Sequence, residues 1–383
     1  MNRIGTTPGT RTRILGAWAV AMVVVAAVLA GCGGGGGEKV ETNRAAGHNE
    51  VIYNGTGKVG YLLPSVTIKI WSGSWVPQFA SYLKQVAPNV EVLPFYANFS
   101  VATQLSQAQA AIAQGVKVLI VAAVDPEQTQ ALAEYAAAHE VKIIAAERQF
   151  LNAEIAGYVG DRAIEIGETM GKWLKENTTK GQTIATLWGD ATDAFYALEQ
   201  KKGALKYLEP LFKSGERKEA GGQFTPEYLP SNARSETAAI LSKTNNEVNA
   251  VLSANDDMAG GVIAALDAAN VKGVKVVGGD ATVEAIQRIL KGTQAMTVYH
   301  GLGAQETAAK AAAYILAGEP FPKGLFNTTV PNGEVEGKEI EVPFKYEPPM
   351  PITKENVDEV VKTKFLTKEL ICKGMPAGIE FCE

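Results

Sequence analysis

Residues 116–123 read VKVLIVAA, and this stretch decides the fold class of the chain. Lys117 is its only polar residue, so the run offers apolar side chains to both faces of a strand. Parallel strands that are covered by helices on both faces have this composition. Residues 102–114 before the run and residues 127–139 after it repeat apolar residues at helical spacing. The stretch therefore predicts a central strand of a parallel sheet with helices packed on either side.

The same alternation of strand and helix extends outward from this stretch in both directions. Further strands are expected at residues 59–63, 90–95, 141–146, 183–188, 250–253, 274–278 and 295–299. Further helices are expected at residues 165–176, 198–212, 233–243, 258–269 and 283–291. Repeated strand-then-helix order predicts an α/β fold, and this many units exceed one small sheet. We therefore expect two doubly wound, Rossmann-like lobes, with the break near residues 157–162.

The N-terminal segment has the pattern of an export signal. Arg3, Arg11 and Arg13 give a basic start, and residues 14–29 are an apolar run that is followed by small residues and Cys32. This order is typical of a secretory signal. A membrane-spanning helix is the alternative, but the run is shorter than the roughly 20 residues that a span needs. The segment resembles the lipobox of bacterial lipoproteins, which implies that Cys32 takes a lipid and becomes the mature N-terminus.

Composition after the signal limits the class of protein. Residues 33–57 are rich in glycine and then polar, which is typical of a flexible tether. The chain has 36 Lys plus Arg against 41 Asp plus Glu, a net charge of −5. Removal of the three arginines of the signal lowers this charge to about −8, whereas a nucleic-acid-binding protein carries a basic footprint. We therefore expect an exported protein that binds no nucleic acid.

Two cysteines lie in the C-terminal tail, at Cys372 and Cys382. Outside the cytoplasm such a pair is usually a disulfide. We expect a local bond that closes a loop of about ten residues and limits the unfolded tail.

Polar residues follow the expected strands at the positions where an open α/β sheet binds its ligands. They are Glu147, Arg148, Asp190, Asp193, Asn255, Asp256, Asp257, Asp280 and His300. Any one of them alone is more often a helix cap or a solvated loop group, and we expect Asp256, Asp257 and Thr282 to be caps. Their recurrence at one strand end after another favours a polar pocket.

The motifs of catalysis and cofactor binding do not fit the chain. Residues 55–60 spell G-x-G-x-x-G, but they precede the first strand and so lack the context of a dinucleotide site. The chain has no G-x-S-x-G or H-E-x-x-H motif, and its three histidines are scattered. An exported enzyme is the rival class; we expect no enzyme, no cofactor and no metal.

Four segments carry a resemblance to a known family. They are SANDDMAGG at residues 253–261, VGGDA at 277–281, ILKGTQAMTVY at 289–299 and QLSQAQAAIAQG at 104–115. Over about residues 58–330 the chain resembles the periplasmic binding proteins of sugar ABC transporters, which have the type I, LacI-like fold. The resemblance is nearest to the xylose and multiple-monosaccharide branch.

The resemblance implies a domain plan with two lobes joined by three crossover strands, near residues 157–162, 294–301 and 326–331. The plan has a signal at 1–31, a tether at 32–57, a first lobe at 58–160 plus about 300–326, a second lobe at 161–299 plus about 327–360, and a tail at 361–383. It also implies a monomer that closes on a sugar and delivers it to an ABC permease, tethered by lipid to the outer face of the cytoplasmic membrane. A sensor that docks on a membrane receptor remains the alternative, because one fold supports both uses.

The resemblance also implies which residues bind the ligand. They are Trp71 as an aromatic platform, Glu147 with Arg148, the hydroxyl-binding Asp193, Asn255 and Asp280, and Tyr228 where an indole is common. Sugars present a C–H face for stacking and hydroxyls for hydrogen bonds, which suits these side chains.

The chain departs from the family at three places. Ala194 and Phe195 replace a pair of asparagines, Arg162 with Ala163 replaces an acid and an asparagine, and His300 replaces a lysine. Phe195 and His300 therefore complete the expected site, and the ligand stays open between a monosaccharide, a sugar alcohol, a nucleoside and another solute. An imidazole has an ordinary pKa of about 6.5, so we expect the affinity to change between about pH 5.5 and 7.5.

Overall fold

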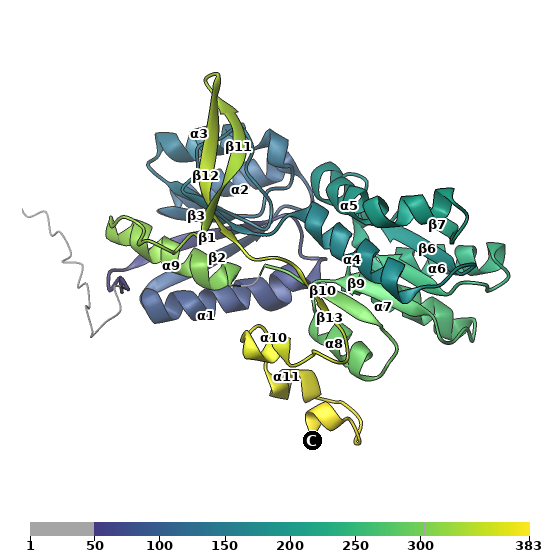
Figure 1. Cartoon of the computed structure of the whole chain (residues 1–383). Coiled ribbons are helices and arrows are strands. Elements are labelled where there is room, and N and C mark those ends of the chain that lie inside the picture. Colours follow the sequence, from purple (N-terminus) through teal and green to yellow (C-terminus); the bar gives the residue numbers. More distant parts are fainter. Residues whose placement is uncertain (1–49, 302) are drawn as a thin grey trace, which may run out of the picture. The chain divides into compact units, whose positions relative to one another are not determined.

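The computed structural model describes residues 50–301 and 303–383, apart from the side chains of residues 194 and 195. The expected signal, the expected lipidation site Cys32 and most of the expected tether lie outside these residues. Within them the chain forms two α/β lobes, one around a seven-stranded sheet and one around a six-stranded sheet (Figure 1). The predicted two-lobed α/β fold is confirmed.

The first sheet surrounds the VKVLIVAA stretch. Its order is β11 (Thr328–Val335), β12 (Lys338–Tyr346), β5 (Gly157–Gly160), β4 (Lys142–Ala146), β3 (Val118–Val121), β1 (Gly57–Leu63) and β2 (Val90–Tyr96). All four residues of β3 are fully buried, with Val118 and Ile120 in one apolar cluster and Leu119 and Val121 in another. The prediction of a central strand buried on both faces is therefore confirmed.

Helices of the first lobe come from two separate parts of the chain. They are the π-helix η1 (Ile70–Trp75), α1 (Val76–Val86), α2 (Val101–Ala113), the short η2 (Pro126–Gln128), α3 (Gln130–Ala138) and α9 (Ala304–Ala317). Helix α9 follows the second lobe in sequence but packs on α1 and on β3, β4 and β5. Its many buried alanines allow this close packing.

The second sheet has the order β13 (Met350–Ile352), β10 (Met296–Tyr299), β9 (Lys275–Gly279), β8 (Ala250–Ser253), β6 (Thr183–Trp188) and β7 (Lys218–Phe224). All its pairs are parallel except β10 with β13. Its helices are α4 (Ala163–Asn177), α5 (Ala194–Lys213), η3 (Pro226–Tyr228), α6 (Pro230–Lys243), α7 (Asp256–Ala268) and α8 (Val283–Leu290). Strands β6 and β8 have the bounds that the sequence predicted.

The chain passes between the two sheets three times. The first crossing follows β5 at residues 161–162, and the second follows β10 at His300 and Gly301. The third follows β12 at residues 347–349, so the expected crossing near residues 326–331 is wrong.

The antiparallel hairpin of β11 and β12 explains this correction. Strands β11 and β12 are neighbours in Figure 1. Strand β12 pairs in parallel with β5 through Phe344 and Tyr158, whose rings stack at 4.5 Å between centroids. Residues 327–346 therefore belong to the first lobe rather than to the second. A hairpin interrupts the strand-then-helix order on which the expected boundary depended.

The C-terminal segment packs on the second lobe through α10 (Glu359–Lys362) and α11 (Lys368–Cys372), and a short turn η4 (Glu380–Cys382) follows. Leu366 and Ile371 are buried in one cluster with Ile286 and Leu290 of α8. Cys372 and Cys382 form a disulfide with their Cα atoms 5.5 Å apart. None of the helices described between residues 50 and 383 is long and apolar enough to cross a membrane.

Candidate functional site

An ion pair joins the strand ends of the two lobes. Arg148 follows β4 of the first sheet, and Asp193 follows β6 of the second sheet. The Arg148 Nη2 lies 2.5 Å from the Asp193 Oδ2, and both side chains are almost fully buried. The two residues are 45 positions apart in sequence, so the expectation that strand-end groups lie close together holds for them.

Aromatic side chains surround this ion pair. The Tyr228 hydroxyl donates to the Asp193 Oδ2 at 2.7 Å, and the Arg148 guanidinium lies 5.4 Å from the ring centres of both Trp71 and Tyr196. Burial first, and then the charge of Asp193, raises the pKa of Tyr228 well above its ordinary value. Tyr228 therefore stays protonated and serves as a donor.

Trp71 and Glu147 form a second buried pair. Trp71 lies in η1, and its Nε1 donates to the Glu147 Oε2 at 2.6 Å. The Glu147 backbone has a φ of 63° and is held by Tyr158, whose hydroxyl donates to its carbonyl at 2.7 Å. Burial raises the pKa of Glu147 to about 8, while Arg148 acts to lower it. The indole edge is used in this contact, and its π face is turned to Arg148.

His300 lies between two carboxylates at the crossings between the lobes. Its Nδ1 is 2.5 Å from the Asp161 Oδ2, and its Nε2 is 3.1 Å from the Asp280 Oδ1. Burial acts to lower the pKa of His300, but the charges and hydrogen bonds of Asp161 and Asp280 outweigh burial and hold the pKa well above 6.5. The two carboxylates therefore favour the charged imidazolium, and the window expected from an ordinary imidazole moves to higher pH.

Asn255, which was expected to bind the ligand, also caps a helix. The Asn255 Oδ1 caps α7 by accepting from the Met258 amide at 3.0 Å. Its Nδ2 has no hydrogen-bond partner in the part of the chain that the structure describes. Only this amide group of Asn255 remains open to a ligand.

The expected caps Asp256 and Asp257 are not caps. Asp256 is fully buried and accepts from the Thr297 hydroxyl at 2.8 Å and the Gln294 amide at 2.7 Å. Burial raises the pKa of Asp256 to about 7. Asp257 accepts from the Lys69 backbone amide of the first lobe at 3.2 Å. Thr282 does cap α8, by accepting from the Ala285 amide at 3.2 Å.

The sequence reasoning missed Asp161 and Tyr196 as site residues. Asp161 directly follows β5, so the strand-end rule applies to it, but residues 157–162 were interpreted only as a hinge. Tyr196 lies in the first turn of α5 and gave no strand-end signal. The expected site residue Phe195 lies in the same turn, and its side chain is outside the described part of the structure.

Two buried atoms of this cluster have no hydrogen-bond partner among the described residues. They are the donor Arg148 Nε and the acceptor Asp161 Oδ1. Buried polar groups are nearly always hydrogen-bonded, so one donor and one acceptor in the same cluster indicate a place for a polar ligand. No group of His, Cys, Asp and Glu within residues 50–301 and 303–383 is arranged to hold a metal ion.

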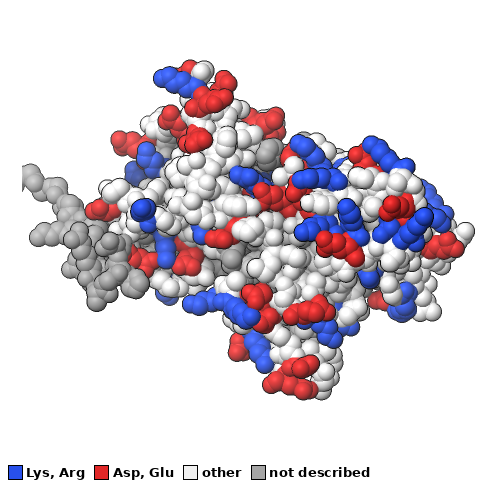
Figure 2. Space-filling view, in the orientation of Figure 1, with Lys and Arg blue, Asp and Glu red and all other residues white. Residues whose placement is uncertain are grey.

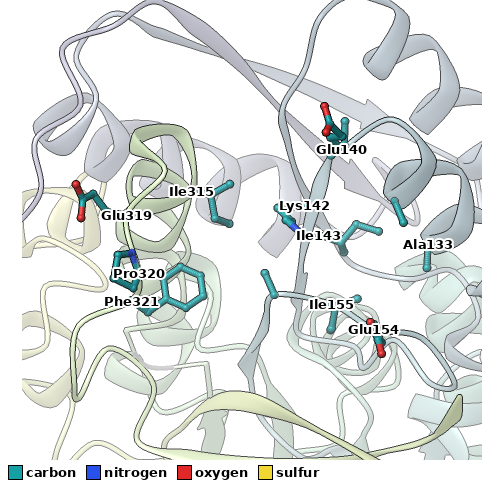
Figure 3. Close-up of a pocket in the computed structure, with 13 residues that line it drawn as sticks. Ala133, Glu140, Lys142, Ile143, Glu154, Ile155, Ile315, Glu319, Pro320 and Phe321 are labelled. Carbon is teal, nitrogen blue, oxygen red and sulfur yellow. The ribbon is translucent and has the colours of Figure 1, made fainter. Parts of the chain in front are cut away.

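A separate cavity of about 390 Å³ lies in the first lobe, at the opposite end of β4. Figure 3 shows Ile315 and Phe321 on one side of it and Ile143 and Ala133 on the other. It is lined by Lys142 at the start of β4, whereas Glu147 follows the end of that strand. This cavity is therefore distinct from the strand-end cluster.

The molecular face drawn in Figure 2 carries basic and acidic side chains intermixed. The polar cluster lies instead in the interior, between the strand ends of two sheets that the chain connects three times. This arrangement and the two-lobed topology point to a binding protein.

Residues 59–320 match the family model described as "Periplasmic binding protein domain". The chain belongs to this family. This family consists of binding proteins, and the two curated relatives described next are named as periplasmic proteins.

Two relatives are similar to this periplasmic binding protein over most of its length. The D-xylose-binding periplasmic protein of Escherichia coli K12 is 30% identical over 326 residues, which are 85% of this chain and 93% of the relative. The protein of the same name from Haemophilus influenzae Rd is 31% identical over 72% of this chain and 81% of the relative.

A solved structure of a carbohydrate transporter solute binding protein from Chloroflexus aurantiacus, in complex with D-glucose, is similar in fold. It has a TM-score of 0.70 and 25% identity, and the match covers 82% of this chain and 98% of that protein. The two-lobed periplasmic binding protein fold is thus shared over nearly the whole of the solved chain.

Proposed function

We propose that this periplasmic binding protein binds a neutral monosaccharide, such as D-xylose, in the strand-end cluster and delivers it to an ABC permease. The observation that carries the proposal is the buried donor Arg148 Nε and the buried acceptor Asp161 Oδ1, which lack partners among the described residues. A sugar hydroxyl can donate and accept at once, so it satisfies both kinds of group.

The charges of the cluster favour a neutral ligand. Asp193 pairs with Arg148, and Asp161 and Asp280 pair with His300, so three carboxyl groups face two cations. Glu147, whose pKa is raised to about 8, is a further acid in the cluster. An anionic solute would add negative charge to a buried site that already holds more acids than bases, which is costly. Neutral polyols and sugars avoid this cost.

The similarity to named proteins supports the same class of ligand. Both curated relatives described above are named for D-xylose, and the Chloroflexus structure is described with D-glucose. Under this proposal Tyr228 and the face of Trp71 that is turned away from Arg148 offer apolar surface to the sugar. Asn255 contributes its free amide group, and Asp280 accepts from a hydroxyl.

We also propose that the chain is exported as a lipid-anchored monomer. The basic start, the apolar run and Cys32 support a lipoprotein signal, and the glycine-rich residues after Cys32 support a flexible tether. Mass spectrometry of the protein from a bacterial host measures the acyl chains on Cys32. An unmodified N-terminus would contradict the anchor but leave the sugar proposal unaffected.

A thermal-shift screen over pentoses, hexoses, polyols and nucleosides tests the sugar proposal. A ligand at 100 times its Kd stabilises the folded chain by about 2.7 kcal/mol, which is readily measured. Calorimetry with the best ligand should then show that Trp71→Ala and Asp280→Ala each weaken binding by about tenfold or more.

The exposed Asp267→Asn substitution on α7 is the matched control and should leave the affinity unchanged. If only nucleosides shift the melting temperature, or if no compound does, the monosaccharide proposal is wrong. If a sugar binds but both variants keep full affinity, the site lies elsewhere.

A further inference from the structure

A second cavity, of about 600 Å³, adjoins the strand-end cluster and is not part of it. Its wall comes from both lobes, from the segments after β1 and β2 in the first and after β6 and β7 in the second. Its volume lies within the range of about 300–1,000 Å³ that is typical of small-molecule sites.

One ring contact and two pairs of chain neighbours place this cavity next to the buried cluster. Thr192 in its wall precedes Asp193, and Glu227 in its wall precedes Tyr228. The Phe99 ring in the same wall lies 6.3 Å from the Trp71 ring, between centroids. The cavity therefore lies beside the residues that would hold a ligand in the cluster.

Each lobe contributes one aromatic ring and one free polar side chain to the cavity. The first lobe provides Phe99 and Asn98, and the second provides Phe224 and Glu227. Asn98 and Glu227 are exposed, and neither side chain has a hydrogen-bond partner among the described residues. Rings that cover C–H faces, beside amide and carboxylate groups that bind hydroxyls, suit a sugar ring.

Asp190 fixes the shape of the second-lobe wall. Its Oδ1 accepts from both the amide and the hydroxyl of Thr192 at 2.6 Å, and its Oδ2 accepts from the Glu227 amide. The carboxylate is thus fully used in holding the two loops together, which leaves Glu227 as the free acid of this wall.

We propose that this cavity, defined by Asn98, Phe99, Phe224 and Glu227, is a subsite for the second ring of a neutral disaccharide. The first ring then occupies the strand-end cluster, so the inference rests on the proposed function and extends its ligand class. The acidic Glu227 and Asp190 disfavour a phosphate or a uronic acid at this position.

Calorimetry with matched pairs tests the subsite: D-xylose against xylobiose, and D-glucose against cellobiose and maltose. At least one disaccharide should bind about tenfold more tightly than its monosaccharide, because it gains the aromatic faces and the free polar groups. Phe224→Leu keeps the apolar bulk but removes the flat face of the ring. It should weaken the binding of that disaccharide by about tenfold. The Kd of the same variant for the monosaccharide should stay within about twofold of the native value.

Asn98→Gly removes the amide and retains the left-handed backbone, since Asn98 has a φ of 50°. The variant should weaken the binding of the disaccharide by about threefold to tenfold. Asn270→Gly is the matched control, because Asn270 is exposed and has a φ of 52° at the far end of α7.

The outcomes separate the two proposals. If a monosaccharide binds and no disaccharide in the set binds more tightly, or if the cavity variants weaken both ligands equally, the subsite is wrong and the proposed function stands. If no sugar binds at all, both proposals fail.

Discussion

Arg148 has more different partners than any other residue discussed in the candidate site. It pairs with Asp193 from the other lobe, lies against the rings of Trp71 and Tyr196, and reaches the backbone carbonyls of Ala123 and Val124 at 3.5 and 3.4 Å. A planar guanidinium can make these contacts at the same time, which the compact ammonium of a lysine cannot. These five partners hold the guanidinium in place and so orient the Arg148 Nε, which has no hydrogen-bond partner among the described residues.

Breaking this ion pair from one side should destabilise the protein. Arg148→Met leaves the Asp193 carboxylate buried without its cation, which costs about 3–5 kcal/mol of unfolding free energy. Removing both charges, in Arg148→Met with Asp193→Asn, should cost clearly less than the sum of the single changes. Urea unfolding of the four proteins measures this coupling, and strictly additive losses would contradict a direct buried pair.

His300 should make the stability depend on pH. Because its folded-state pKa is raised, its contribution is fully present below the ordinary value of 6.5 and is lost as the pH rises through the folded-state pKa. The stability advantage of the native chain over His300→Gln should therefore shrink from about pH 6.5 upward. Thermal unfolding of both proteins at a series of pH values from about 6 to 10 measures this difference in stability.

Two other features define this pH experiment. Glu147 has a pKa raised to about 8, so its contribution to the stability also falls as the pH rises. His300 acts to lower this pKa, so the contribution of Glu147 differs between the two proteins and is part of the measured difference. The exposed His139→Gln at the end of α3 carries the same substitution as a control. A difference between native and His300→Gln that is constant with pH would contradict the His300 assignment.

At the scale of elements, the packing of α4 on α5 depends on small residues. A Cβ on Gly203 of α5 would lie 1.9 Å from the Ile164 carbonyl oxygen, and a Cβ on Gly167 of α4 would lie 1.8 Å from the Gln200 carbonyl oxygen. Both obstacles are backbone atoms of the facing helix, so the helices must separate to admit a methyl group. These glycines are required by the close approach of the two helices.

Gly203→Ala should therefore destabilise the fold, by about 1–3 kcal/mol or more. Gly260→Ala within α7 is the matched control, because the nearest atom to its Cβ would be a side-chain atom, the Arg288 Nη1 of α8, at 3.3 Å. That change should be neutral or stabilise the protein by up to about 1 kcal/mol, since glycine is unfavourable inside a helix. Equal losses for the two variants in urea unfolding would show that the α4–α5 contact is looser than the structure has it.

The disulfide in the C-terminal segment should matter for stability and leave ligand binding unchanged. It closes a separation of 10 residues next to the cluster that α11 forms with α8. Replacing Cys372 and Cys382 with serine should cost about 2–3 kcal/mol by the loop-closure relation. Reducing agent should lower the melting temperature of the native chain and leave that of the double variant unchanged, and a loss of sugar affinity in the variant would contradict a purely local role.

At the scale of the whole molecule, the three crossings determine how the lobes can move. Asp161 lies in the first crossing and His300 begins the second, so the site includes the segments that must bend. Hinge motions concentrate in a few such residues. Ligand that bridges the lobes should therefore reduce the radius of gyration of this binding protein.

Small-angle scattering with and without saturating ligand measures this change. Compaction should be seen with the best sugar from the thermal-shift screen and should be smaller with Asp161→Asn, which weakens the contact with His300. Identical scattering curves with and without a ligand that calorimetry shows to be bound would contradict the hinge-closing mechanism.

Several elements could not be predicted because their sequences carry no strong period. Strand β7 reads KEAGGQF, and its two glycines have φ values of 85° and 90°, so neither an apolar run nor an alternation is present. Strand β12 was assigned to the wrong lobe because its place depends on Phe344 stacking on Tyr158, a contact between residues far apart in sequence. Such pairings are decided by the tertiary structure.

The sequence by itself determined the fold class, most strands and helices, and the residue types at the strand ends, because buried parallel strands and their helices impose local patterns. It also determined that polar groups would collect where those strands end. Only the tertiary structure decided their partners: Arg148 meets Asp193, and Asp161 meets His300 across 139 positions. It also decided that the pKa of His300 is raised, because a pKa depends on the burial and charges around a group, which the sequence does not place in space.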